Sequence, residues 1–128
     1  WIEGKYRIQG DKAHRAMAGL SMGSLQTSVI TLRNQELFDH VGIFSGFVQD
    51  VLSNYQGHVT PELLKTYGEQ IKYIFRAMGQ EDVFMNAFLA DDELLAEYNI
   101  VHQRVLYPGY HEWKVWQRCI HDFVKEIF

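Results

Sequence analysis

The segment Gly19-Leu20-Ser21-Met22-Gly23 has the pattern Gly-x-Ser-x-Gly and stands between two stretches of contrasting character. Residues 13–18 are short and mostly apolar, as in a β-strand, whereas apolar residues recur at helical spacing over residues 24–33. The pattern therefore predicts a sharp strand-to-helix turn with a strained serine at its tip, which is typical of a nucleophile elbow. A glycine-rich turn in which Ser21 only caps the helix is the alternative.

The remaining chain alternates between strand-like and helix-like stretches. We expect residues 1–8 to be the end of a helix, residues 47–60 to be irregular, further strands at 41–44, 71–78 and 103–107, and helices at 61–68, 85–98 and 112–127. Strands that alternate with helices form a parallel sheet covered on both faces. The sequence thus predicts an α/β fold, a three-layer αβα arrangement with a mainly parallel sheet of about four strands.

Composition narrows the class of protein further. The 128 residues are 47% hydrophobic, which suits one globular domain. A net charge of −4 without long charged runs disfavours nucleic acid as a partner. No apolar run approaches the length of about 20 residues that a membrane span needs, and no group of His, Asp or Glu has metal-ligand spacing, so neither membrane, metal nor cofactor is expected. Cys119, the single cysteine, is expected in the core.

Ser21, Asp82 and His111 each lie just past the end of a different expected strand. Because the carboxyl ends of parallel strands meet at one edge of a sheet, where sites form, these side chains are expected to converge. Their order along the chain, Ser, Asp, His, is the order that the α/β-hydrolase arrangement requires. His111 would then accept the proton of the Ser21 hydroxyl while Asp82 accepts the second ring N–H.

Other residues compete for these roles. Glu81 is adjacent to Asp82 and stays open as the acid, whereas Asp91 and Asp92 lie within an expected helix and should be solvated. His111 is favoured as the base because it follows a strand in a Pro-Gly-x-His turn. The competing histidines are His14 in the first strand, His40, His58, His102 before the last strand and His121 in the last helix.

Met22 belongs to the expected site, and Trp113 is a further candidate for it. The backbone N–H of Met22, at the start of the helix after the turn, would supply one donor of an oxyanion hole. Trp113 and Trp116 continue an apolar stripe along the last helix, with Ile120, Phe123 and Ile127, and are expected in the core. For Trp113, a place in the lining of the substrate site is the alternative.

Four stretches together resemble the "Putative esterase" family of the α/β-hydrolase superfamily. They are RAMAGLSMGS (15–24), FDHVGIFSGF (38–47), GQEDVF (79–84) and YPGYHEWKVWQRCIHDFVKEIF (107–128). This family includes feruloyl and acetyl-xylan esterases, enterochelin esterase, esterase D and the mycolyltransferases. The resemblance implies that Ser21 is the nucleophile, Asp82 the acid and His111 the base. It departs at Ser24, where members usually carry a second glycine.

The activity implied by the resemblance is that of a serine carboxylesterase. Its expected substrates are carbohydrate-linked esters, such as feruloyl or acetyl esters of xylan, and no cofactor is needed. Two alternatives remain: a catalytically idle fragment or binding module that keeps the fold, and an acyltransferase that uses the same triad. The resemblance favours a secreted or periplasmic location for enzymes of xylan esters and a cytoplasmic one for other branches.

The resemblance covers the whole chain but only about half of a complete family domain. Residues 1–128 are therefore expected to be a single α/β-hydrolase domain that lacks its N-terminal half. That half would hold the second oxyanion donor and the strand that pairs with residues 13–18. Because an unpaired hydrophobic strand invites association, we expect a homo-oligomer or association with the missing half.

Overall fold

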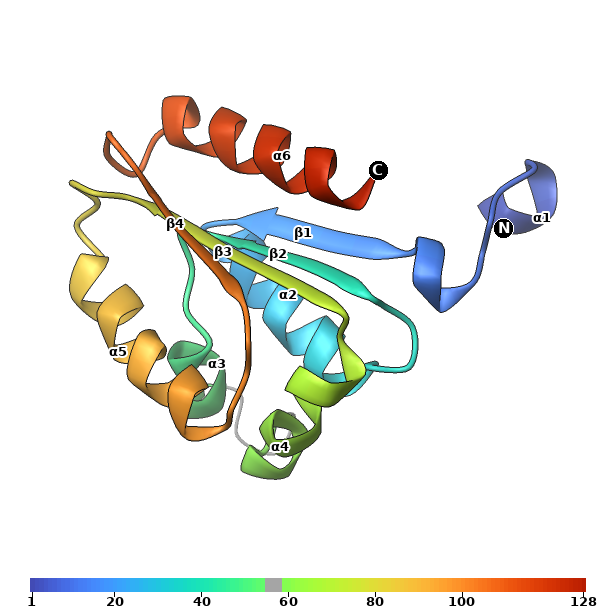
Figure 1. The fold of residues 1–128 in the computed structure, drawn as a ribbon, viewed down its shortest axis with the longest axis horizontal. Coiled ribbons are helices and arrows are strands. Elements are labelled where there is room, and N and C mark those ends of the chain that lie inside the picture. Colours follow the sequence, from blue (N-terminus) through green and yellow to red (C-terminus); the bar gives the residue numbers. More distant parts are fainter. Residues whose placement is uncertain (55–58) are drawn as a thin grey trace.

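The computed structural model describes residues 1–54 and 59–128. Along the chain, the elements are α1 (Ile2–Lys5), the 3-10 turn η1 (Lys12–His14), β1 (Ala16–Leu20), α2 (Met22–Arg33), β2 (His40–Phe44), α3 (Gln49–Asn54), α4 (Pro61–Gln70), β3 (Tyr73–Gly79), α5 (Met85–Glu97), β4 (Gln103–Tyr107) and α6 (Trp113–Ile127). The helix expected over residues 1–8 is thus limited to the four residues of α1, which extends away from the sheet (Figure 1).

The four strands form one parallel sheet in the order β1-β2-β3-β4. Helix α6 covers one face, and α2, α3, α4 and α5 lie on the other (Figure 1). This confirms the expected three-layer α/β architecture. The register places Leu20 beside Phe44 and Phe44 beside Ala77, so the residues that follow β1 and β2 emerge together at the carboxyl edge.

Alternation of side chains along the strands divides the core into two layers. Val41 and Ile43 of β2 point to the face of α2 and α4, where they pack with a large aliphatic cluster. Phe44 points to the opposite face and packs with Phe75 and Phe123 beneath α6. Strands that are buried on both faces consist of nearly continuous apolar residues, so β2 and β3 could be predicted from the sequence.

The first strand begins later than expected. The Asp11 side chain accepts the backbone N–H of His14 at 3.1 Å and caps the turn η1, so the placement of His14 in the first strand was wrong. Gly19 and Leu20 are instead the last residues of β1. The strand lies at the edge of the sheet, and none of its residues is fully buried.

A short helix, α3, occupies residues that were expected to be irregular. The Asp91 carboxylate accepts the backbone N–H groups of Val48 at 2.6 Å and Gln49 at 2.9 Å, where α3 begins. Asp91 is fully buried, so the expectation that it is solvated was also wrong. Residues 55–58, which include the candidate His58, lie outside the described residues.

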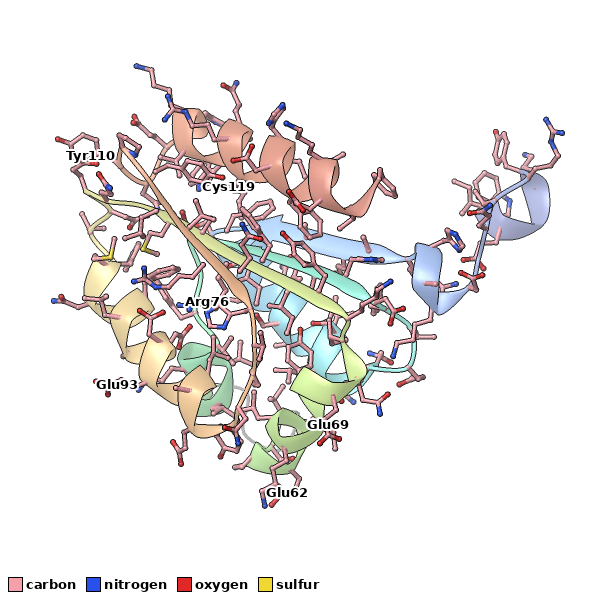
Figure 2. The ribbon with its side chains drawn as sticks, viewed as in Figure 1. Glu62, Glu69, Arg76, Glu93, Tyr110 and Cys119 are labelled. Carbon is pink, nitrogen blue, oxygen red and sulfur yellow. The ribbon has the colours of Figure 1, made fainter. Side chains whose placement is uncertain are left out.

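Helix α6 packs on the sheet through Val115, Cys119 and Phe123, all buried. Cys119 is a core residue as expected, and burial raises the pKa of its thiol to about 12; Figure 2 shows where it lies on α6. Trp113, however, is 67% exposed and Ile120 45%, so these two expected core residues lie outside the core.

Within the described residues, no helix is both long and apolar enough to cross a membrane.

Candidate active site

Three side chains from separate segments meet at the carboxyl edge of the sheet. His111 Nε2 lies 2.8 Å from Ser21 Oγ, and His111 Nδ1 lies 2.8 Å from Asp82 Oδ2. An ionised carboxylate only accepts hydrogen bonds, so Nδ1 carries the proton and Nε2 accepts the Ser21 hydroxyl. The arrangement can take a proton from Ser21 and stabilise the imidazolium that results.

The turn that presents Ser21 is strained and tightly packed. Ser21 has φ 51° and ψ −119°, and its N–H donates to Phe44 O at 2.9 Å. A Cβ on Gly19 would lie 2.2 Å from the carbonyl oxygen of Gly23, so only glycine fits at this position, two residues before the serine. A Cβ on Gly23 would meet nothing within 4 Å. The first glycine is therefore the one that close packing requires in this structure.

Ser24, at the position where the resemblance leads us to expect a second glycine, is fully buried. Its hydroxyl donates to the carbonyl oxygen of Ser21. A Cβ on Gly46 would lie only 1.4 Å from Ser24 Oγ, so the missing side chain at Gly46 leaves room for the larger residue. The glycine after β2 thus makes room for the Ser24 side chain beside the turn.

The two adjacent acidic residues have different partners. Asp82 is 4% exposed, and its second oxygen accepts the N–H of Phe84 at 2.9 Å, which fixes the carboxylate toward His111. Glu81 accepts the N–H of Gly109 at 2.6 Å through its side chain and donates its own N–H to Gly109 O at 3.0 Å. The structure therefore brings Asp82 to His111, while Glu81 joins the loops that carry them.

The competing histidines that the structure describes have other surroundings. His40 begins β2, and the other three have ring nitrogens bonded elsewhere: His14 to Asp11 at 2.6 Å, His102 to Ile100 O at 3.0 Å and His121 to Asp122 at 2.9 Å. His102 also bonds Arg76 at 3.0 Å, whereas His111 bonds both Asp82 and Ser21, 29 and 90 positions away.

A cavity of about 240 Å³ opens beside Ser21. Its lining includes Ser45, Gly46, Phe47, Phe84 and Met22. Phe47 and Phe84 contact each other edge-on with centroids 5.6 Å apart, and Phe84 contacts the His111 ring at 5.4 Å. Apart from Met22, the sequence analysis did not predict these wall residues, although Ser45 and Gly46 follow β2 at the same sheet edge as the Gly-x-Ser-x-Gly turn.

Met22 is the first residue of α2, directly after Ser21. Its backbone N–H belongs to the unsatisfied donors at a helix N-terminus, where the helix dipole favours negative charge. The geometry therefore suits stabilisation of an oxyanion that forms next to Ser21.

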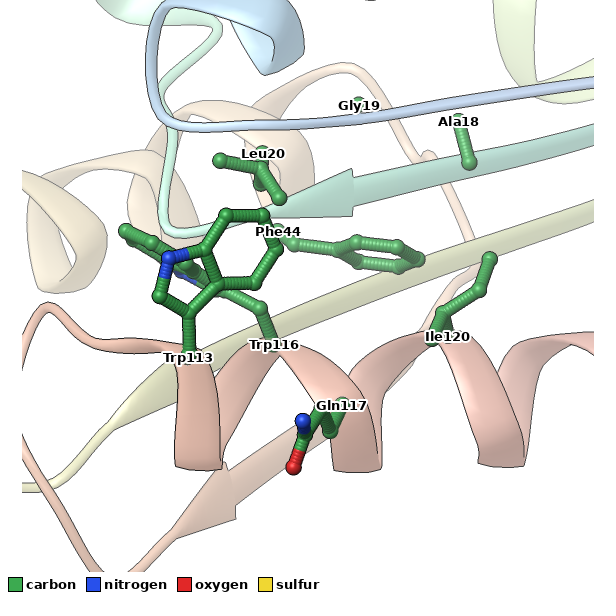
Figure 3. Close-up of a pocket in the computed structure, with 8 residues that line it drawn as sticks. All are labelled: Ala18, Gly19, Leu20, Phe44, Trp113, Trp116, Gln117 and Ile120. Atoms are coloured by element: carbon green, nitrogen blue, oxygen red, sulfur yellow. The ribbon is translucent and has the colours of Figure 1, made fainter.

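Trp113 lies over a second cavity, an apolar groove of about 270 Å³ between β1 and α6 (Figure 3). Ala18, Leu20, Phe44, Trp116 and Ile120 also line it. Trp116 connects this groove to the site, because its ring contacts both Trp113 at 5.3 Å and His111 at 5.1 Å. Trp113 thus lines the groove beside β1 and not the cavity at Ser21.

A charged cluster around Arg76 joins β3 and β4 to α5. Arg76 of β3 is fully buried between the sheet and α5 (Figure 2). It donates to Asp92 at 2.8 Å and to Phe88 O at 2.9 Å, and Arg104 also binds Asp92. Although partial burial alone would raise the pKa of Asp92, the hydrogen bonds from Arg104 and Arg76 lower it. Asp92, whose side chain is 29% exposed, is therefore a half-buried partner of two arginines.

Comparisons with known proteins agree with this architecture. Residues 1–127 match the family described as "Putative esterase". A curated relative from Xylanibacter ruminicola, named Endo-1,4-beta-xylanase/feruloyl esterase, is 32% identical over 127 residues, which are 99% of this chain and 16% of the relative.

Solved structures share the fold. An S-formylglutathione hydrolase from Staphylococcus aureus matches with a TM-score of 0.79 at 20% identity, over 99% of this chain and 56% of that one. A ferulic acid esterase matches with a TM-score of 0.78 at 24% identity, over 99% and 57%. The chain therefore spans a little more than half the length of these structures and 16% of the curated relative. With the family match over nearly its whole length, the chain belongs to the "Putative esterase" family and has the α/β-hydrolase fold.

Proposed function

We propose that the chain carries the catalytic residues of a serine carboxylesterase, with Ser21 as nucleophile, His111 as base and Asp82 as the acid that orients His111. The hydrogen-bonded series Asp82–His111–Ser21, with both contacts at 2.8 Å, is the observation that supports this proposal most strongly. A serine hydroxyl becomes an effective nucleophile only when a positioned base accepts its proton.

The reaction follows from the positions of these atoms. Ser21 Oγ attacks the ester carbonyl carbon while His111 Nε2 takes its proton. The carbon–oxygen bond to the alcohol then breaks, and the alcohol leaves with that proton, so an acyl-enzyme remains. Water, deprotonated by His111, attacks the acyl group, which leaves as the carboxylic acid as Ser21 regains its proton.

The negative oxygen of each tetrahedral intermediate needs at least two donors. We assign the Met22 N–H as the donor within this chain. We propose that the second donor comes from a segment outside these 128 residues. Loss of one oxyanion donor typically lowers turnover by about 10²–10³. We therefore expect only slow turnover from the isolated chain.

Carbohydrate-linked feruloyl or acetyl esters are the substrates that we propose. The relative named as a xylanase and feruloyl esterase is 32% identical, and the phenyl rings of Phe47 and Phe84 beside Ser21 suit an aromatic acyl group. Because an enzyme encounters xylan esters outside the cell, we also propose a secreted or periplasmic location.

Hydrolysis of methyl ferulate and p-nitrophenyl acetate tests this function, with Ser21→Ala as the control. We expect slow ferulate and acetate release by the wild-type chain and none above background by the variant. Equal rates in the two chains would contradict the proposal, and no turnover with no covalent labelling of Ser21 would favour the idle fragment. Transfer of the acyl group to an added sugar in preference to water would favour the acyltransferase.

We also propose that β1 pairs with a further strand, from a segment outside these residues or from a second copy. Three features support this. The strand is at the sheet edge, its flank is the apolar groove under α6, and Trp1, Ile2, Tyr6 and Ile8 in the N-terminal segment are exposed. An added parallel strand would satisfy the outer N–H and C=O groups of β1 and cover this apolar surface.

A further inference from the structure

The imidazole of His111 lies against the indole of Trp116, and the indole is itself held by a hydrogen bond. The His111 and Trp116 ring centroids are 5.1 Å apart, with an angle of 88° between the rings. Trp116 Nε1 donates to Ser45 Oγ at 3.1 Å. Ser45 follows β2, and Trp116 belongs to α6, so this contact joins the sheet to the helix directly next to the imidazole.

Ser45 has a backbone conformation that normally favours glycine. Its φ is 49°, in the left-handed region, where a side chain is costly. It is 2% exposed, and its N–H donates to Ala77 O at 2.8 Å, so the sheet fixes its backbone. A serine at such a position supplies a hydroxyl that glycine lacks, and here that hydroxyl accepts the indole N–H of Trp116.

His111 needs support beyond its two hydrogen bonds. It lies in the loop between β4 and α6, and its side chain is 25% exposed. The bonds to Asp82 and Ser21 are made by the two ring nitrogens, so they hold those atoms but do not alone fix the tilt of the ring about the line through both nitrogens. Edge-on ring contacts limit such a tilt, and those to His111 come from Phe84 and Trp116.

We propose that Ser45 and Trp116 are positioning residues for His111, an inference that rests on the proposed function of the Asp82–His111–Ser21 series. The Ser45 hydroxyl orients the indole, and the indole holds the imidazole at the tilt that aims Nε2 at Ser21 Oγ. Their loss should slow the step in which Nε2 takes the proton and leave the affinity for the reactant unchanged. Because Ser45 also lines the cavity at Ser21, direct contact with the reactant is the competing explanation.

Reaction of Ser21 with a fluorophosphonate tests this inference. In that reaction, Ser21 Oγ bonds to phosphorus, fluoride leaves, and the hydroxyl proton passes to His111. We compare the wild-type chain with Ser45→Ala, Trp116→Phe and the double variant, over a range of reagent concentrations. Each single change should lower the maximal labelling rate about tenfold, which corresponds to the loss of one well-placed hydrogen bond. The concentration for half-maximal rate should stay constant, and the double variant should be no slower than the singles.

Two controls separate positioning from folding. Tyr107→Phe removes another hydrogen bond of α6, from the Tyr107 hydroxyl to Asp122, and should label at the wild-type rate. Ser45→Gly suits the left-handed backbone and removes only the side chain, so it should fold as well as the wild type and label as slowly as Ser45→Ala.

The possible results distinguish a failure of the proposed function from a failure of the positioning proposal alone. An unlabelled Ser21 in the wild-type chain overturns the proposed function and this inference with it. A labelled wild type with unchanged single variants overturns the inference alone. Losses that add in the double variant, or a raised half-maximal concentration, overturn it too, because they indicate that Ser45 meets the reactant directly.

Discussion

At the scale of single residues, the two glycines of the Gly-x-Ser-x-Gly turn have different functions. A side chain at Gly19 meets the backbone of Gly23 at 2.2 Å, and backbone cannot move aside as a flexible side chain can. A side chain at Gly23 meets nothing within 4 Å. Close packing of β1 against α2 therefore requires glycine at position 19 but not at position 23.

Alanine at each glycine tests this difference. Gly19→Ala should lower the free energy of unfolding by about 3 kcal/mol, because the added methyl group forces β1 and α2 apart. Gly23→Ala should raise it by about 0.5–1 kcal/mol, because alanine is the better residue inside a helix. Denaturant unfolding of both variants measures the two changes, and equal destabilisation would show that the packing argument is wrong.

His102 gives a residue-scale prediction about pH. Its Nε2 lies 3.0 Å from Arg76 Nη1, which can only donate, so Nε2 is the acceptor and the neutral ring is the bound form. Burial lowers the pKa of His102, and the charges of Arg76 and Arg104 lower it further against the opposing effects of Ile100 O and Asp92. The folded chain thus binds fewer protons than the unfolded chain.

The resulting stability is complete above the unfolded pKa of about 6.5 and is lost as the pH falls toward the lower folded pKa. We expect the free energy of unfolding to decrease between pH 7.5 and pH 5.5, with a smaller decrease in His102→Gln. The matched control is His121→Gln, since the His121 side chain is 70% exposed. If the His102 and His121 variants keep the same pH slope, the assignment to His102 fails.

At the scale of elements, the loop after β3 and the loop after β4 are joined by Glu81. Its side chain and backbone both bond to Gly109, two residues before His111. Glu81 thus holds the loop that carries His111 beside the loop that carries Asp82. The sequence left Glu81 open as an alternative acid, and the structure gives it this connecting position.

Variants of Glu81 measure the importance of the connection. Glu81→Ala should lower the rate of Ser21 labelling by about tenfold, because the Gly109 N–H loses its charged acceptor and the loop can shift. Glu81→Gln keeps an acceptor oxygen and should retain most of the rate. Equal rates for both variants and the wild type would mean that the loop is held by other contacts.

Most elements could be predicted from sequence because their signals are local. Apolar stretches identified β2 and β3, and apolar residues at helical spacing identified α2 and α6. The helix α3 could not be predicted, because its first N–H groups bond to Asp91, 42 and 43 residues later in the chain.

The same distinction applies to the site. The positions of Ser21, Asp82 and His111 could be predicted from strand ends and chain order, whereas the contacts that Ser45, Phe84 and Trp116 make in the site could not. Their contacts to the site depend on side-chain packing between distant segments, which periodicity does not report. Trp113 was misplaced for a related reason: an apolar stripe on a helix predicts a buried face, but in this structure the groove beside it lies open.

At the scale of the whole molecule, the unpaired edge of β1 and the groove in Figure 3 form one continuous flank. We expect the isolated chain to associate through this flank, so its mass in dilute solution, measured by analytical ultracentrifugation, should exceed that of the 15.0 kDa monomer. Leu20→Lys places a charge in the groove and should shift the equilibrium toward monomer. A compact monomer at micromolar concentration in the wild type would contradict this expectation.

The central claim is that Ser21 is activated by His111, which Asp82 orients. Peptide mapping by mass spectrometry after reaction with a fluorophosphonate tests it most directly. We predict one adduct, on the peptide that contains Ser21, which disappears in His111→Ala and forms far more slowly in Asp82→Asn. An adduct at another serine, or one at Ser21 that forms at the same rate without the His111 imidazole, would contradict the account.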